Sequence, residues 1–112
     1  MNKNYFVDHK KTEWIKGKIE GFSGKDLLSI NNGGVKLVRV SPESSYPVHT
    51  HPDKTEFMYL LEGKLNCFVD NEEFDCNSGD FIVFPEGMEH GIRNLTNEEA
   101  LAIIGNIKTI DR

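Results

Sequence analysis

Three histidines and one glutamate in this chain are spaced so that they could hold one metal ion. His49 and His51 lie two residues apart, and because successive side chains of a strand alternate, both imidazoles should project to the same side. Glu56 has the opposite parity to His51 and joins that side only if the chain bends at Pro52-Asp53, residue types that favour a turn. His90 follows Glu56 by 34 residues and begins an apolar run that closure of a β-barrel would bring beside the first group.

This donor set favours a divalent transition metal. Imidazole and carboxylate suit Fe, Mn, Co, Ni, Cu or Zn, whereas Mg and Ca prefer oxygen, so the ligand types do not choose among the first six. Four protein ligands on a six-coordinate ion leave two positions for water, substrate or dioxygen. One carboxylate on a doubly charged cation leaves a surplus positive charge, which favours anionic oxygen ligands such as carboxylates, enolates or hydroxy acids.

Three further residues, Arg39, Tyr46 and Glu89, are candidates for a catalytic role. A guanidinium can fork onto a carboxylate, a phenol can donate or shuttle a proton, and a carboxylate beside the last histidine could act as a base, a role that is also open to Glu86. Each has a plainer alternative. Arg39 is solvated if its two valine neighbours face inward, and carboxylates in turns are commonly solvated.

The segments that must position these residues read as a series of short strands. From residue 27 onward, apolar runs alternate with clusters of Gly, Pro, Asn and Asp, which is typical of an all-β barrel or sandwich rather than of βαβ units. We expect about nine strands. The clearest runs are residues 27–30, 35–40, 57–61, 65–69, 74–76, 81–84, 90–93 and 100–107. Residues 42–47 are expected to form a loop, and run 57–61 to pair with run 65–69 across the turn at Glu62-Gly63.

Composition and charge narrow the function classes. Thirteen basic against eighteen acidic residues give a net charge of −5, which argues against a nucleic acid partner. No apolar run approaches the ~20 residues of a membrane-spanning helix. The first residues lead into charges rather than into the core of a signal peptide, so we expect a cytoplasmic protein that does not bind membranes. Residues 1–26 lack the strand pattern and are expected to form an arm across a single domain at residues 27–112.

The spacing of the candidate ligands resembles the two motifs of the cupin superfamily. The first motif has two histidines, a glutamate and a glycine at fixed intervals, matched here by His49, His51, Glu56 and Gly63. The second motif is matched by Gly79, Pro85, Gly87, His90 and Asn94. One position departs from the pattern, since Glu43 stands where the family has a glycine, six residues before the first histidine.

The resemblance covers roughly residues 35 to 105, and the short interval between the motifs is typical of small single-domain microbial cupins. It implies a jelly-roll β-barrel, a metal held by His49, His51, Glu56 and His90, and a homodimer as a common assembly. It does not imply one reaction, because cupins include dioxygenases, isomerases, lyases and proteins that only bind small molecules.

Two side-chain sets bear on assembly and redox state. Phe57, Tyr59 and Phe68 are expected to face outward as an aromatic patch, which supports a homodimer unless the arm covers it. Cys67 and Cys76 are not spaced like a zinc site or a CxxC pair and are expected to be packing residues.

Two functions remain open at this point. The first is a metal-dependent enzyme of the dioxygenase, isomerase or lyase type acting on a small oxygenated or anionic molecule. The second is a barrel that binds or senses a small acid or sugar without turnover. A well-placed acid or base in the pocket would distinguish the first from the second.

Overall fold

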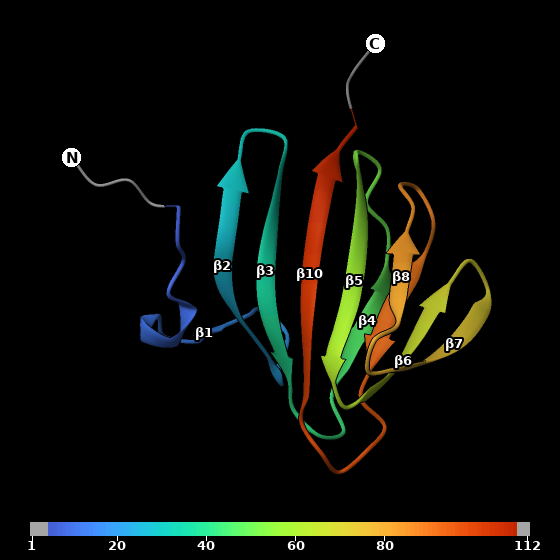
Figure 1. Ribbon diagram of the computed structural model, residues 1–112. Coiled ribbons are helices and arrows are strands. Elements are labelled where there is room, and N and C mark those ends of the chain that lie inside the picture. Colours follow the sequence, from blue (N-terminus) through green and yellow to red (C-terminus); the bar gives the residue numbers. More distant parts are fainter. Residues whose placement is uncertain (1–4, 110–112) are drawn as a thin grey trace.

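The computed structural model describes residues 5–109, and most of them lie in strands, as expected for an all-β chain (Figure 1). Within this range there is one turn of 3-10 helix, η1 (His9–Lys11), and ten strands. The strands are β1 (Ile15–Lys16), β2 (Phe22–Ile30), β3 (Gly33–Val40), β4 (Ser45–His49), β5 (Lys54–Glu62), β6 (Lys64–Val69), β7 (Glu72–Asn77), β8 (Phe81–Phe84), β9 (His90–Arg93) and β10 (Ala100–Lys108).

The strands form two antiparallel sheets. The larger sheet has the order β1-β2-β3-β10-β5-β8 and the smaller sheet the order β4-β9-β6-β7. Figure 1 shows β2, β3, β10 and β5 side by side, with the strands of the smaller sheet grouped at one end of the larger one. The last strand of the chain therefore lies between β3 and β5, a long-range connection typical of a jelly roll, which confirms the predicted fold class.

The apolar core lies between the two sheets and continues up to the candidate ligands. Its buried members come from both sheets: Phe22, Val40, Met58, Leu60, Leu65, Cys67, Cys76, Phe84, Ile92, Ala100 and Ala102. Along β5, Met58 and Leu60 are fully buried, and Glu56 lies two residues before Met58 on the same face of the strand. The hydrophobic packing thus fixes the direction in which Glu56 points.

The predicted pairing of runs 57–61 and 65–69 is wrong. β5 pairs with β10 and β8, whereas β6 pairs with β7 and β9, so the two runs belong to different sheets. Gly63 connects them with φ at +89°, a backbone conformation that glycine adopts without steric cost. The predicted pairing would place Met58 opposite Cys67 in one sheet, whereas the two are core residues of opposing sheets.

Two boundaries also differ from the sequence-based expectation. The strand predicted from residue 27 begins at Phe22, and β4 starts at Ser45, inside the predicted loop. β4 is an edge strand with β9 as its neighbour in the sheet, so Pro47, which has no N–H, does not interrupt a ladder between two strands. β1 pairs with β2 through Ile15 and Gly24, which attaches the N-terminal segment to the edge of the larger sheet.

Candidate metal centre

The four predicted ligands come from both sheets and meet at the rim of the core. His49 is the last residue of β4 and pairs directly with His90, the first residue of β9. His51 lies just beyond β4, and Glu56 lies in β5 of the opposite sheet. Closure of the barrel therefore brings His90 to the first three residues, as the sequence predicts.

The ligand atoms converge on one point. The donor atoms of His49, His51, Glu56 and His90 all lie within 4.8 Å of one another. A Glu56 carboxylate oxygen, Oε1, is 3.0 Å from Nε2 of His90 and 3.3 Å from Nε2 of His51. Two donors that are each about 2.1 Å from one ion lie about 3 Å apart when the donor–ion–donor angle is a right angle. The donor set therefore fits a single transition-metal ion.

Hydrogen bonds fix which ring nitrogen of two histidines faces the centre. Nδ1 of His49 lies 2.8 Å from the carbonyl oxygen of Pro47, and Nδ1 of His90 lies 3.3 Å from that of Met88. A carbonyl oxygen only accepts, so Nδ1 carries the proton and donates it in each ring. Nε2 of each ring then faces the cluster, where it would offer its lone pair to a bound ion, the arrangement that metal-binding histidines commonly show.

Electrostatics favour the deprotonated, metal-competent forms. Burial tends to raise the pKa of the Glu56 carboxyl, but the hydrogen bond with His90 and the nearby His51, His90 and Lys54 outweigh it and lower that pKa. Desolvation by burial lowers the pKa of His51, and the opposing attraction of Glu56 does not overcome it. At neutral pH the cluster thus holds one carboxylate and a neutral His51.

The cluster opens onto a cavity of about 300 Å³, here called the histidine cavity. It is lined by Lys18, Lys36, Tyr46, His49, His51, Lys54, Glu56, Phe84, His90, Ile92 and Ile104. Phe84 stacks on the His90 ring with centroids 4.8 Å apart, so one wall holds the imidazole in place. Sequence reasoning missed the three lysines, although strand alternation with Val38 and Val40 places Lys36 on the inward face of β3.

The comparison with known sequence families settles the family. The cupin domain family matches residues 36–104, which include all four candidate ligands and both motifs. The chain belongs to the cupin family.

Germin-like proteins of two plants are among the similar sequences. A putative germin-like protein 3-2 of Oryza sativa subsp. japonica is 36% identical over 99 residues, covering 82% of this chain and 45% of that protein. Germin-like protein subfamily 1 member 17 of Arabidopsis thaliana is 37% identical over 101 residues, covering 81% of this chain and 46% of its own length. The chain spans about half the length of the curated relatives it matches.

Solved cupin structures resemble the whole chain in fold. KdgF from Halomonas sp. superposes with a TM-score of 0.83 at 19% identity, covering 98% of this chain and 97% of that one. A sugar phosphate isomerase of the cupin superfamily from Silicibacter pomeroyi gives a TM-score of 0.82 at 24% identity, covering 93% and 76% of the two chains. At these identities the likeness shows the fold.

The cupin motif residues outside the metal cluster shape the loops around it. Asn94 is 1% exposed; its amide donates to the carbonyl oxygens of Val40 and Glu98, and its oxygen accepts from the backbone and hydroxyl of Thr96. These bonds tie the loop after β9 to β3. Glu43, which replaces the family glycine, has φ at +57°, so the loop keeps a left-handed residue although the side chain disfavours it.

The three predicted catalytic residues lie in different places. Tyr46 lines the histidine cavity, and its ring centroid is 5.0 Å from that of His49. Arg39 points to the outer face of the larger sheet, where its guanidinium lies 4.4 Å from the ring centroid of Trp14 and its Nε is 3.6 Å from Glu99. Glu89 does not line the cavity, and its backbone oxygen accepts from the Asp70 amide.

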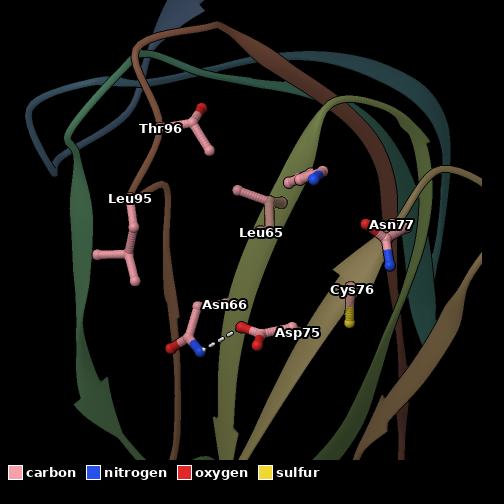
Figure 2. Close-up of a pocket in the computed structure, with 8 residues that line it drawn as sticks. Leu65, Asn66, Asp75, Cys76, Asn77, Leu95 and Thr96 are labelled. Atoms are coloured by element: carbon pink, nitrogen blue, oxygen red, sulfur yellow. Dashed lines mark hydrogen bonds between the residues drawn. The ribbon is translucent and has the colours of Figure 1, made fainter.

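A separate hollow of about 220 Å³ lies near the other end of the smaller sheet, between β6, β7 and the loop after β9 (Figure 2). Figure 2 shows the bond from Asn66 Nδ2 to Asp75 Oδ1, 2.9 Å long, beside this hollow. None of the four candidate ligands lines it, so we assign it no part in metal binding.

Over residues 5–109, no helix has the length and apolar character to cross a membrane.

Proposed function

We propose that this cupin is a metal-dependent enzyme acting on a small anionic, oxygenated molecule by isomerase, lyase or dioxygenase chemistry. The observation that carries the proposal is the convergence of His49, His51, Glu56 and His90 at a cavity that also holds three lysines. A divalent ion bound there would polarise a carbonyl or carboxylate oxygen as a Lewis acid, or activate dioxygen if the ion is iron.

The chain's own residues divide the remaining work. Nδ1 bonds to backbone carbonyls hold His49 and His90 in one orientation. Tyr46 is packed between His49 and Phe22, whose ring meets it edge-on at 5.2 Å, so its phenol has a fixed place at the cavity wall. A phenol that touches the substrate can donate a proton or, once ionised, accept one. Tyr46 is therefore our candidate acid or base.

A binding or sensing role is the second candidate, and a specific observation favours it. Of the three residues predicted to be catalytic, only Tyr46 lines the histidine cavity, and the Glu56 carboxylate is engaged with two histidines. The candidate acid–base groups are thus few. A protein that holds an acid on its metal without turnover needs none.

Two measurements test the proposal. Elemental analysis of protein purified without added metal should find about one transition-metal ion per chain, and a His49→Ala variant should lose it. In heavy water, the metal-loaded protein should then exchange the hydrogens next to the carbonyl of small 2-oxo acids, as measured by mass spectrometry. The Tyr46→Phe variant should lose this exchange while retaining the metal. Metal uptake with bound acid, but with neither exchange nor oxygen consumption, would favour the sensing role; absence of metal after reconstitution would overturn both.

We also propose that the protein is a cytoplasmic homodimer. The predicted aromatic patch is split, since Phe68 lies in the smaller sheet, but Phe57 stacks on Phe81 at 5.7 Å on the larger one. Phe81 and Tyr59 are 57% and 40% exposed, and the described part of the N-terminal segment, from residue 5 onward, packs over β2 and β3 rather than over them. Sedimentation should give twice the chain mass of 12.7 kDa, and a monomer would refute the dimer.

A further inference from the structure

The histidine cavity has a positive charge that the chain as a whole does not. Lys18, Lys36 and Lys54 line it together with one carboxylate, Glu56, in a protein whose net charge is −5. Among the described residues, no carboxylate oxygen lies within 4.0 Å of any of these three ammonium groups. Lysines gathered at one cavity without ion-pair partners favour an anionic occupant.

A second cavity adjoins the first on the side away from β5. This side cavity, of about 390 Å³, is bounded by the N-terminal segment and by β2 and β3. Lys18, Lys36 and Tyr46 line both cavities, and Lys16 adds a further cation to the side cavity alone. Asp26, the register partner of Lys36, is the carboxylate in that lining. Lys36 and Lys18 thus lie where the two spaces meet.

The distance between Lys36 and the cluster suits a second functional group on one small molecule. Lys36 lies on β3, and β10 separates β3 from β5, which carries Glu56. Strands about 4.8 Å apart put the β3 backbone about 10 Å from that of β5. Lys36 pairs with Ile104 and Ile104 pairs with Met58, so Lys36 lies one step along the sheet from Glu56, on the same inward face.

We propose that Lys36, assisted by Lys18, forms a cationic subsite that binds a second acidic group of the substrate. The substrate class is then a small acid with two anionic ends: one end carries the oxygens that chelate the metal, and the other, a carboxylate or a phosphate, pairs with Lys36. This inference rests on the proposed function, because it takes the metal cluster as the first anchor. It assigns the N-terminal segment a role as one wall of the substrate site.

Paired probes test whether the second acidic group is recognised. Calorimetry on protein loaded with one equivalent of Zn²⁺ compares 2-hydroxyglutarate with 2-hydroxypentanoate, which has the same chain length and a methyl group in place of the second carboxylate. We expect the dianion to bind about five- to tenfold more tightly. A second pair, 3-phosphoglycerate and glycerate, shows whether phosphate is preferred to carboxylate at the same place.

The variant Lys36→Met locates the effect. It should reduce the affinity for 2-hydroxyglutarate to that for 2-hydroxypentanoate, while the affinity for 2-hydroxypentanoate and the zinc content stay unchanged. Lys64→Met is the matched control, because it removes the same charge from β6 beside the separate hollow. This control should keep the preference for the dianion.

Different outcomes overturn different claims. Equal losses in Lys36→Met and Lys64→Met would mean that net charge alone attracts the acids and would overturn the subsite. Wild-type protein that binds zinc and both acids of each pair equally would also overturn it, and would leave the proposed function standing. Wild-type protein that takes up none of zinc, iron, manganese, cobalt, nickel or copper would overturn the proposed function, and the subsite with it.

Discussion

Replacing His49 by alanine should remove the thermal stabilisation that a metal ion confers. A ligand present at 100 times its dissociation constant stabilises a folded protein by about 2.7 kcal/mol. About 1 kcal/mol shifts the melting temperature of a domain near this size by roughly 4–8 °C, so the wild-type shift should be roughly 10–20 °C. Loss of one of four converging ligands should weaken binding by at least about 100-fold. The same metal concentration then yields only about 0.4 kcal/mol, a shift of roughly 2–3 °C.

The metal-free variant should remain folded. His49 is only partly buried, and its ring hydrogen bond goes to a carbonyl oxygen in an exposed environment, so its loss costs about 1 kcal/mol. Differential scanning fluorimetry with and without Zn²⁺ gives both quantities. His9→Ala is the control, because it removes a histidine from η1, outside the cluster. A metal shift in His49→Ala that equals the wild-type shift would refute the cluster as the binding site.

The pH range in which metal raises the melting temperature follows from the lowered pKa values of two candidate ligands. Desolvation lowers the pKa of His51, and the hydrogen bond from His90 with the surrounding positive charges lowers the pKa of Glu56 despite its burial. A lowered pKa means that each group stays deprotonated to lower pH in the folded state, and that folding is less favourable as pH falls through that value. The metal-induced shift should persist at pH 6.5 and disappear as the pH falls further. If the metal-induced rise in melting temperature were already lost at pH 7, the lowered pKa values of His51 and Glu56 would be contradicted.

Three further perturbations test the loops and the core. Asn94→Ala removes four hydrogen bonds, one buried and three partly buried, at about 1 kcal/mol each, so thermal circular dichroism should show a melting temperature lowered by more than about 12 °C; a fall under about 4 °C would contradict this. Glu43→Gly relieves a left-handed residue that costs about 1 kcal/mol, partly offset by the freedom of glycine in the unfolded chain, so the melting temperature should rise by up to about 5 °C rather than fall. Burial raises the pKa of the Cys67 and Cys76 thiols, so iodoacetamide at pH 8 should modify them only after denaturation; equal rates in native and denatured protein would refute their protection.

The metal cluster could be predicted because most of its members are close in sequence. Closeness in sequence keeps three of them, His49, His51 and Glu56, near one another in any fold of the chain. Only the approach of His90 depends on the fold. Barrel closure supplies that contact through the direct pairing of β4 with β9. A strand-turn pattern that requires closure, together with the motif spacing, was sufficient for this step.

The strand partners could not be predicted in the same way. Alternation states which face of β5 is buried, and Met58 and Leu60 are indeed fully buried, but it does not state which strand lies alongside. Adjacency in sequence favoured β6, whereas β10, which follows some forty residues later, occupies that place in the sheet. The choice depends on how two sheets pack around one core, and no local feature of the Glu62-Gly63 turn encodes it.

Arg39 and Lys36 show that the face of β3 on which a residue lies, more than its side-chain chemistry, decides whether it reaches the cavity. Val38 and Val40 face inward, so alternation along β3 directs Arg39 outward, where it meets Trp14, and Lys36 inward, where it meets the cavity. A guanidinium binds carboxylates well, which makes Arg39 a candidate by its chemistry, yet that advantage acts only on the face that the ligand reaches. Lys36 joins Lys18 and Lys54 at the cavity, so a chain of net charge −5 has a positively charged cavity rim. Under the proposed subsite, the charge of the ligand follows from the residues that line the cavity rather than from the net charge of the whole chain.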